Sequence, residues 1–152
     1  MLPMRETSLA TEAHVTARPF LKWAGGKSQL LPELAKRLPR QFRHYHEPFV
    51  GGGALFFYLS NRGLLRHGAT LSDYNPELIL CYEVIRDHVE ELIVALKKHQ
   101  QHQLKPEYFL QVRAWDRQPD FAKRDPIERA ARAIFLNRTC YNGLCRFNRK
   151  GE

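Results

Sequence analysis

Residues 47–57, Glu-Pro-Phe-Val-Gly-Gly-Gly-Ala-Leu-Phe-Phe, constrain the fold of this chain more than any other stretch. The pattern predicts the end of a strand, a glycine turn and the start of a buried helix. Three consecutive glycines leave the turn without any Cβ atom, so the backbone can adopt positive φ and approach a ligand closely. A helix that begins directly after such a turn points its unpaired N–H groups at that ligand.

An acid follows the next apolar strand, which we expect at residues 69–73. Asp73 comes twenty-two positions after Gly51. A glycine turn followed by an acid at about this spacing is typical of a nucleoside site, where the acid accepts the ribose hydroxyls. The dinucleotide fingerprint would need glycine at position 56, where Phe56 stands. The identity of the nucleoside therefore stays open, and a simple tight turn is the alternative.

A second glycine turn precedes the first one. Residues 19–31 combine an apolar approach, Gly25-Gly26 and the start of a helix that should end near Arg37. Trp23 can stack on a purine, and Lys27 can reach a carboxylate or a phosphate. A phosphate-binding loop of the nucleotidase type would need glycine at position 21, where the chain has Leu. A nucleotidase is therefore a minor alternative.

Charge and cysteine content narrow the class of protein. The net charge of +8 favours a polyanionic partner, above all nucleic acid. The three cysteines form no Cys-x-x-Cys pair, which argues against a disulfide framework or a zinc site and favours the reducing cytoplasm. No run of apolar residues is long enough for a membrane span, so we expect no membrane association.

The rest of the chain predicts a short α/β part followed by helices. We expect a strand at residues 43–50, a helix at 54–61, and one long helix from Pro76 to about His99. Further helices should cover residues 106–117 and begin at Pro126. Asn75 and Asp125 each precede a proline, as helix caps do. This order indicates an α/β core that carries a helical subdomain.

The last helix runs into a basic loop with aromatic and amide side chains. Between residues 137 and 150 there is no acid, and the loop contains Arg138, Arg146, Arg149, Lys150, Tyr141, Phe147, Asn137, Asn142 and Asn148. Arginine reads guanine, asparagine reads adenine, and a ring can fill the space of an extruded base. The loop thus favours DNA recognition, with a solvated basic turn as the alternative.

Taken together, these motifs resemble the first half of a Dam-type (D12 class) DNA adenine-N6 methyltransferase. The resemblance covers residues 18–152 and depends on residues 20–27, 47–53, 72–75 and 136–146. It implies a Rossmann-like core that uses S-adenosylmethionine, here incomplete, and a helical target-recognition subdomain. On this basis we expect a mobile tail at residues 1–17, the core part at 18–75 and the recognition subdomain at 76–152.

The resemblance also assigns roles to individual residues. The residues implied for the S-adenosylmethionine site are Trp23, Lys27, Phe49, Gly51, Gly53 and Asp73. The residues expected to contact double-stranded DNA, at a GATC-like site, are Arg138, Tyr141, Asn142, Leu144, Arg146 and Asn148. Restriction–modification, repair and regulation all remain open as biological roles.

One family motif is absent. The Asp-Pro-Pro-Tyr motif accepts hydrogens from the adenine amino group and stacks the flipped base, but this sequence contains no Pro-Pro. We therefore expect a truncated chain that is inactive alone and carries no catalytic residue of its own, with a complementing C-terminal half as one option. The alternative from a different class is a non-catalytic DNA-binding regulator.

Overall fold

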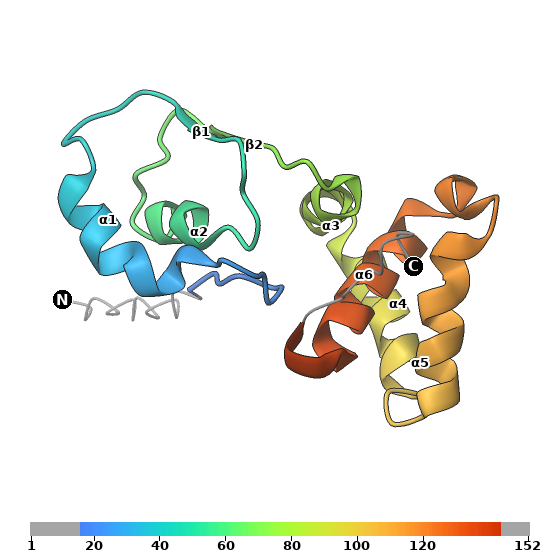
Figure 1. The fold of residues 1–152 in the computed structure, drawn as a ribbon. Coiled ribbons are helices and arrows are strands. Elements are labelled where there is room, and N and C mark those ends of the chain that lie inside the picture. Colours follow the sequence, from blue (N-terminus) through green and yellow to red (C-terminus); the bar gives the residue numbers. More distant parts are fainter. Residues whose placement is uncertain (1–15, 144–152) are drawn as a thin grey trace, which may run out of the picture.

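A computed structural model describes residues 16–143 and contains both helices and strands. The elements in chain order are η1 (Lys27–Leu30), α1 (Leu31–Arg37), β1 (Tyr45–Glu47), α2 (Ala54–Ser60), β2 (Ala69–Leu71), α3 (Pro76–Asp87), α4 (Val89–Gln100), α5 (Pro106–Arg113), η2 (Ala114–Arg117), η3 (Phe121–Lys123), α6 (Pro126–Thr139) and η4 (Tyr141–Gly143), where η marks a 3-10 helix. In Figure 1, α1, α2 and the strands lie on one side, and α3 to α6 form a helical block on the other.

The two strands form a small parallel sheet. Tyr45 pairs with Ala69 and Glu47 with Leu71, and α2 connects the two strands. The backbone pairing continues past both strands, because the Ser72 N–H donates to the Glu47 carbonyl and the Val50 N–H donates to the Ser72 carbonyl. This extension brings the glycine turn next to Asp73, as the strand–turn–helix–strand pattern predicts. The α/β class is therefore confirmed at the level of a two-stranded parallel unit.

Two helix starts follow the predicted capping chemistry. The Asn75 side chain accepts hydrogen bonds from the N–H groups of Glu77 and Leu78, at 3.0 and 3.3 Å. The Asp125 side chain does the same for Ile127 and Glu128, at 2.8 and 3.2 Å. In both cases a proline occupies the first turn, where its missing N–H costs nothing.

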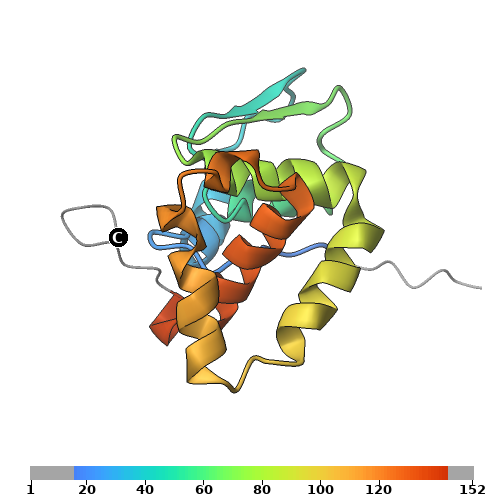
Figure 2. The same ribbon diagram turned by 90° about the vertical axis from the view of Figure 1, so that its right-hand side faces the viewer.

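The predicted single helix from Pro76 to His99 is wrong. The backbone of His88, with φ −140° and ψ 40°, ends α3 and begins α4. Both helices pack against α6, and Figure 2 shows α6 between α4 and α5. A one-residue break leaves the apolar spacing almost unchanged, so periodicity alone does not reveal it. The predicted helix at 106–117 similarly consists of α5 followed by η2.

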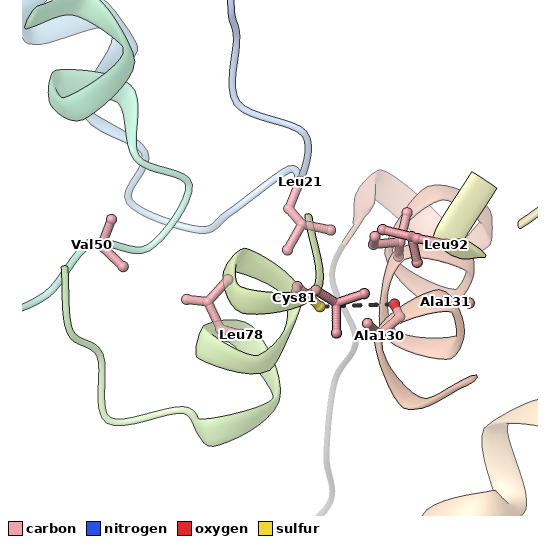
Figure 3. Packing of buried hydrophobic residues seen from close by; sticks show 9 residues of the cluster. Leu21, Val50, Leu78, Cys81, Leu92, Ala130 and Ala131 are labelled. Carbon is pink, nitrogen blue, oxygen red and sulfur yellow. Dashed lines mark hydrogen bonds between the residues drawn. The ribbon is translucent and has the colours of Figure 1, made fainter. Parts of the chain in front are cut away.

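The main hydrophobic core joins the α/β part to the helical block. Leu21 and Val50 come from the first part and pack with Leu78, Cys81 and the α6 alanines (Figure 3). A second cluster inside the block contains Val112, Phe135 and Leu136. Burial of apolar surface of this kind is the main stabilising term in folding, so the two parts stabilise each other.

The N-terminal edge of the described region is also attached. The predicted mobile tail, residues 1–17, lies outside the described residues except for its last two positions. There the Ala17 N–H donates to Asn61 Oδ1 at 3.0 Å, and Asn61 Nδ2 donates back to the Ala17 carbonyl at 2.8 Å. Among residues 16–143, no helix is both long and apolar enough to cross a membrane.

Candidate cofactor site and DNA-recognition segment

All six residues that the sequence assigns to the methyl donor lie around one cavity. This cavity has a volume of about 200 Å³, and its lining includes Trp23, Lys27, Phe49, Gly51, Gly53 and Asp73. They come from the two glycine turns and from the end of β2, which are separated by more than twenty residues at each step. Their roles stay predictions, but the fold brings the predicted set together.

The glycine turn has no room for larger side chains. Gly51 and Gly53 have φ values of +49° and +70°. A Cβ added at Gly51 would lie 2.8 Å from Trp23 Cδ1, and one at Gly53 would lie 2.5 Å from the Tyr82 hydroxyl oxygen. Both positions therefore need glycine for two reasons, backbone conformation and close approach.

Asp73 holds the same turn from the other side. Its Oδ2 accepts a hydrogen bond from the Gly51 N–H, and its Oδ1 accepts one from the Asn75 N–H, both at 3.0 Å. The carboxylate is half-buried and borders the cavity. It keeps acceptor capacity beyond these two bonds, because an ionised carboxylate has about four lone-pair sites. Asp73 can thus hold the turn and still accept ligand hydroxyls.

Glu47 is a further residue of the site that the sequence analysis did not single out. It is only 8% exposed and lines the cavity. Its Oε1 lies 3.7 Å from Lys27 Nζ, and its Oε2 accepts a hydrogen bond from the Tyr45 hydroxyl at 2.7 Å. Burial, together with the Glu47 carboxylate, raises the pKa of Tyr45 and keeps the phenol protonated. Its place directly before Pro48-Phe49, at the end of a strand, is the signal that could have identified it.

Tyr82 connects the helical block to the turn. Its hydroxyl donates to the Gly51 carbonyl at 3.0 Å, and its ring packs edge-on against Phe20. Burial raises the pKa of Tyr82, and the charges of Glu47 and Asp73 raise it further. Nothing in the local sequence around position 82 distinguishes this tyrosine from a core residue, so sequence reasoning missed it.

The predicted DNA-contacting residues lie where α6 ends. Arg138 is exposed, although its Nη2 also donates to the Phe20 carbonyl at 2.9 Å. Tyr141 is 85% exposed and lies in η4 together with Asn142. The predicted contacts Leu144, Arg146 and Asn148 lie outside the described residues. The interpretation of Asn137 as an adenine-reading amide is wrong, because its side chain is buried and hydrogen-bonded to backbone.

A larger cavity of about 340 Å³ lies between residues 21–24, just before the Gly25-Gly26 turn, and the helical block. Of the six predicted cofactor residues it includes only Trp23. Its walls combine apolar side chains such as Leu21 and Leu136 with Glu77, which is paired with Arg129. Within residues 16–143 no group of His, Cys, Asp and Glu side chains is arranged to hold a metal ion.

The sequence was compared with known proteins. It matches the family described as D12 class N6 adenine-specific DNA methyltransferase over residues 23–152. It is 42% identical to the type II methyltransferase M1.LlaDCHI of Lactococcus lactis subsp. cremoris, over 95% of this chain and 49% of that protein. It is 41% identical to the type II methyltransferase M.MjaIII of Methanocaldococcus jannaschii, over 89% of this chain and 50% of that protein.

A further relative is the DNA adenine methylase of Escherichia coli, which is 37% identical over 89% of this chain and 45% of that protein. The chain thus spans about half the length of the curated relatives it matches. The family match covers most of the chain and includes the residues of the smaller cavity. The chain therefore belongs to the D12 class of N6 adenine-specific DNA methyltransferases.

Proposed function

We propose that this chain is the donor-binding and target-recognition part of a site-specific DNA adenine-N6 methyltransferase that uses S-adenosylmethionine. The observation that carries the proposal is the convergence of the six predicted residues on one cavity. Family membership and the relatives named as DNA adenine methylases support the same reaction. A Rossmann-like core, a GATC-like target and action in the cytoplasm belong to the proposal as its finer parts.

The residues of the cavity fit such a donor. Gly51 and Gly53 line the cavity, and a Cβ at either position would collide with Trp23 or Tyr82, so the turn keeps this shape only with glycine. Asp73 would accept the ribose hydroxyls, and Trp23 offers an aromatic face for the adenine ring. Lys27 lies where it can pair with the methionine carboxylate, and Glu47 holds its ammonium group nearby. When bound, the donor supplies an electrophilic methyl group on a sulfonium sulfur.

The DNA-facing part of the proposal depends on the end of α6 and the loop after it. The exposed Tyr141 ring and the Arg138 guanidinium lie close to each other in sequence, at the end of that helix. An exposed ring next to basic side chains is the combination that enzymes use when they extrude a base. We propose that Asn142, Leu144, Arg146 and Asn148 continue this contact surface.

In this proposal, residues outside this sequence carry out the methyl transfer. The 152 residues contain no Asp-Pro-Pro-Tyr, the motif that the family resemblance implies for accepting hydrogens from the adenine amino group. We propose that the chain by itself binds donor and DNA without transferring the methyl group. A second polypeptide that carries the motif would restore transfer.

The direct test is donor binding by calorimetry. We expect Asp73→Ala to weaken S-adenosylmethionine binding at least about tenfold, because a carboxylate-to-hydroxyl hydrogen bond contributes roughly 1.5–3 kcal/mol. Asp87→Ala is the matched control, since Asp87 is an exposed acid that pairs with Arg86 at the end of α3. An unchanged titration for Asp73→Ala would remove Asp73 from the site.

The same titrations separate the alternatives. A non-catalytic DNA-binding regulator would bind DNA and show no affinity for the donor. A nucleotidase would hydrolyse ATP in a manner that depends on Lys27. The sequence disfavours the nucleotidase, because Leu21 stands where a phosphate-binding loop has glycine.

A further inference from the structure

Asn137 forms an unusual link between distant parts of the chain. Its side chain is 7% exposed, and it pairs with the backbone of Lys22, 115 positions away. The Lys22 N–H donates to Asn137 Oδ1 at 2.9 Å, and Asn137 Nδ2 donates to the Lys22 carbonyl at 2.7 Å. The carboxamide thus pairs with Lys22 as the backbone of a neighbouring strand would.

The same carboxamide also holds the start of the proposed DNA-contacting loop. Asn137 Nδ2 donates a second hydrogen bond to the Gly143 carbonyl, at 2.9 Å. Gly143 lies so close to Lys22 that an added Cβ would be 2.7 Å from two carbons of the Lys22 side chain. Three segments therefore meet at Asn137: the end of α6, the short helix η4 that contains Gly143, and the segment around Lys22.

The segment held by Asn137 continues directly into the donor cavity. Trp23 follows Lys22 and packs against the glycine turn. A Cβ added at Gly51 would lie 2.8 Å from the Trp23 ring, and one added at Gly52 would lie 3.4 Å from the Trp23 Cβ. The Tyr82 hydroxyl fixes the Gly51 carbonyl from the helical block. A displacement of Lys22 would therefore move Trp23 relative to the turn that it helps to form.

We propose that Asn137 is a positioning residue that couples DNA engagement to donor binding. It does so by fixing the Lys22–Trp23 backbone to the base of the DNA-contacting loop. With η4 in place, Gly143 lies against Lys22, which holds Trp23 in the donor cavity. By linkage, a bound donor favours the same loop position. This inference rests on the proposed function, because it needs the donor at Trp23 and the DNA beyond Tyr141.

The test compares variants by donor affinity and by the environment of Trp23. The chain has two tryptophans, so a Trp115→Phe background leaves Trp23 as the only tryptophan whose emission is followed. In that background we expect Asn137→Ala to increase acrylamide quenching of Trp23 and to weaken S-adenosylmethionine binding about tenfold. Val112→Ala controls for lost stability, since Val112 is fully buried in the second core cluster and borders neither cavity.

A second measurement addresses coupling itself. A short duplex with a single GATC site should improve donor affinity of the unmodified chain about fivefold or more, and this improvement should vanish in Asn137→Ala. If the alanine variant fails to fold, Asn137→Asp serves instead. It keeps the volume and the acceptor for the Lys22 N–H, but it cannot donate to the two carbonyl oxygens.

The outcomes are distinct. Wild-type quenching and wild-type donor affinity in Asn137→Ala would overturn the inference alone, as would DNA that leaves the donor affinity of the unmodified chain unchanged. Equal weakening of donor binding in Val112→Ala and Asn137→Ala would also overturn it, because stability would then explain the loss. No donor binding by the unmodified chain would overturn the proposed function together with this inference.

Discussion

The α/β part and the helical block use their residues in different ways. In the α/β part, backbone conformation shapes the smaller cavity, which three glycines with positive φ line (Gly25, Gly51 and Gly53). The strands there are short, and α1 has no buried residue. In the helical block, fully buried side chains form the core, as Cys81, Val112 and the α6 alanines do. The comparison teaches that the region shaped for a ligand is thinly packed and depends on the other region for its stability.

Buried polar groups show the same contrast. In the α/β part the buried Glu47 faces a cavity and pairs with a partly exposed lysine. In the helical block Arg132 is buried among backbone carbonyls of Val112 and Arg113 and pairs with Asp116 at 2.9 Å. The first arrangement leaves a charge available to a ligand, whereas the second satisfies it within the protein.

The largest effect should come from the helical block. We expect Arg132→Ala to lower the free energy of unfolding by about 3 kcal/mol, because it orphans two carbonyls and leaves Asp116 without its partner. Urea unfolding followed by circular dichroism measures this change. Arg86→Ala, which removes an exposed ion pair with Asp87, should leave the free energy of unfolding nearly unchanged. Similar losses in the two variants would mean that the block does not hold the stability we assign to it.

A glycine substitution sharpens the comparison from the other side. We expect Gly53→Ala to weaken donor binding about tenfold and to cost about 1–2 kcal/mol of stability, because its φ is +70° and its new Cβ would meet the Tyr82 hydroxyl. Gly63→Ala is the control, since Gly63 has φ +63° but open space around it. Both variants carry backbone strain, and only the first should affect donor titrations.

A double variant isolates the clash. Tyr82→Phe removes the oxygen that an alanine at position 53 would meet, so Gly53→Ala combined with Tyr82→Phe should recover part of the donor affinity. No recovery would mean that backbone strain and the Phe57 ring, 3.2 Å from the added Cβ, set the requirement for glycine, and not the contact with the helical block.

The smallest effect is the pH dependence of the helical block. Burial lowers the pKa of His99, whose Nδ1 shares a hydrogen bond with the Tyr108 hydroxyl and whose ring stacks on Phe135. The unfolded chain then binds a proton more readily than the folded one. The stabilisation that depends on neutral His99 is therefore fully present above about pH 6.5. The free energy of unfolding falls as the pH drops below this value, by at most about 1.4 kcal/mol per pH unit.

Urea titrations at several pH values measure this dependence. His99→Gln should flatten it, because the amide oxygen can accept from Tyr108 without titrating. His67→Gln, at an exposed position near the strands, should leave the slope unchanged. A slope that survives in His99→Gln would assign the pH response to other groups.

Local motifs explain why the residues around the smaller cavity could be predicted to lie together. The glycine turn, the acid after β2 and the Trp-Lys pair each follow from residues close together in sequence, and parallel pairing of the strands then brings them to one edge. Tyr82 and Asn137 were not predictable in this way, because their partners lie 31 and 115 positions away. The break at His88 escaped for a related reason, since packing against α6 decides it and the local spacing does not.

The burial of Cys81 makes the reactivity of its thiol a measure of how often α3 and α6 separate. Its thiol is fully buried between α3 and α6, where it donates to the Ala130 carbonyl (Figure 3). Burial and the nearby Glu77 charge raise its pKa to about 12, so hardly any reactive thiolate exists while the helices are in contact. A reagent can modify this sulfur only after α3 and α6 separate. Under native conditions the rate at which Cys81 is modified therefore reports how often α3 and α6 separate within the helical block.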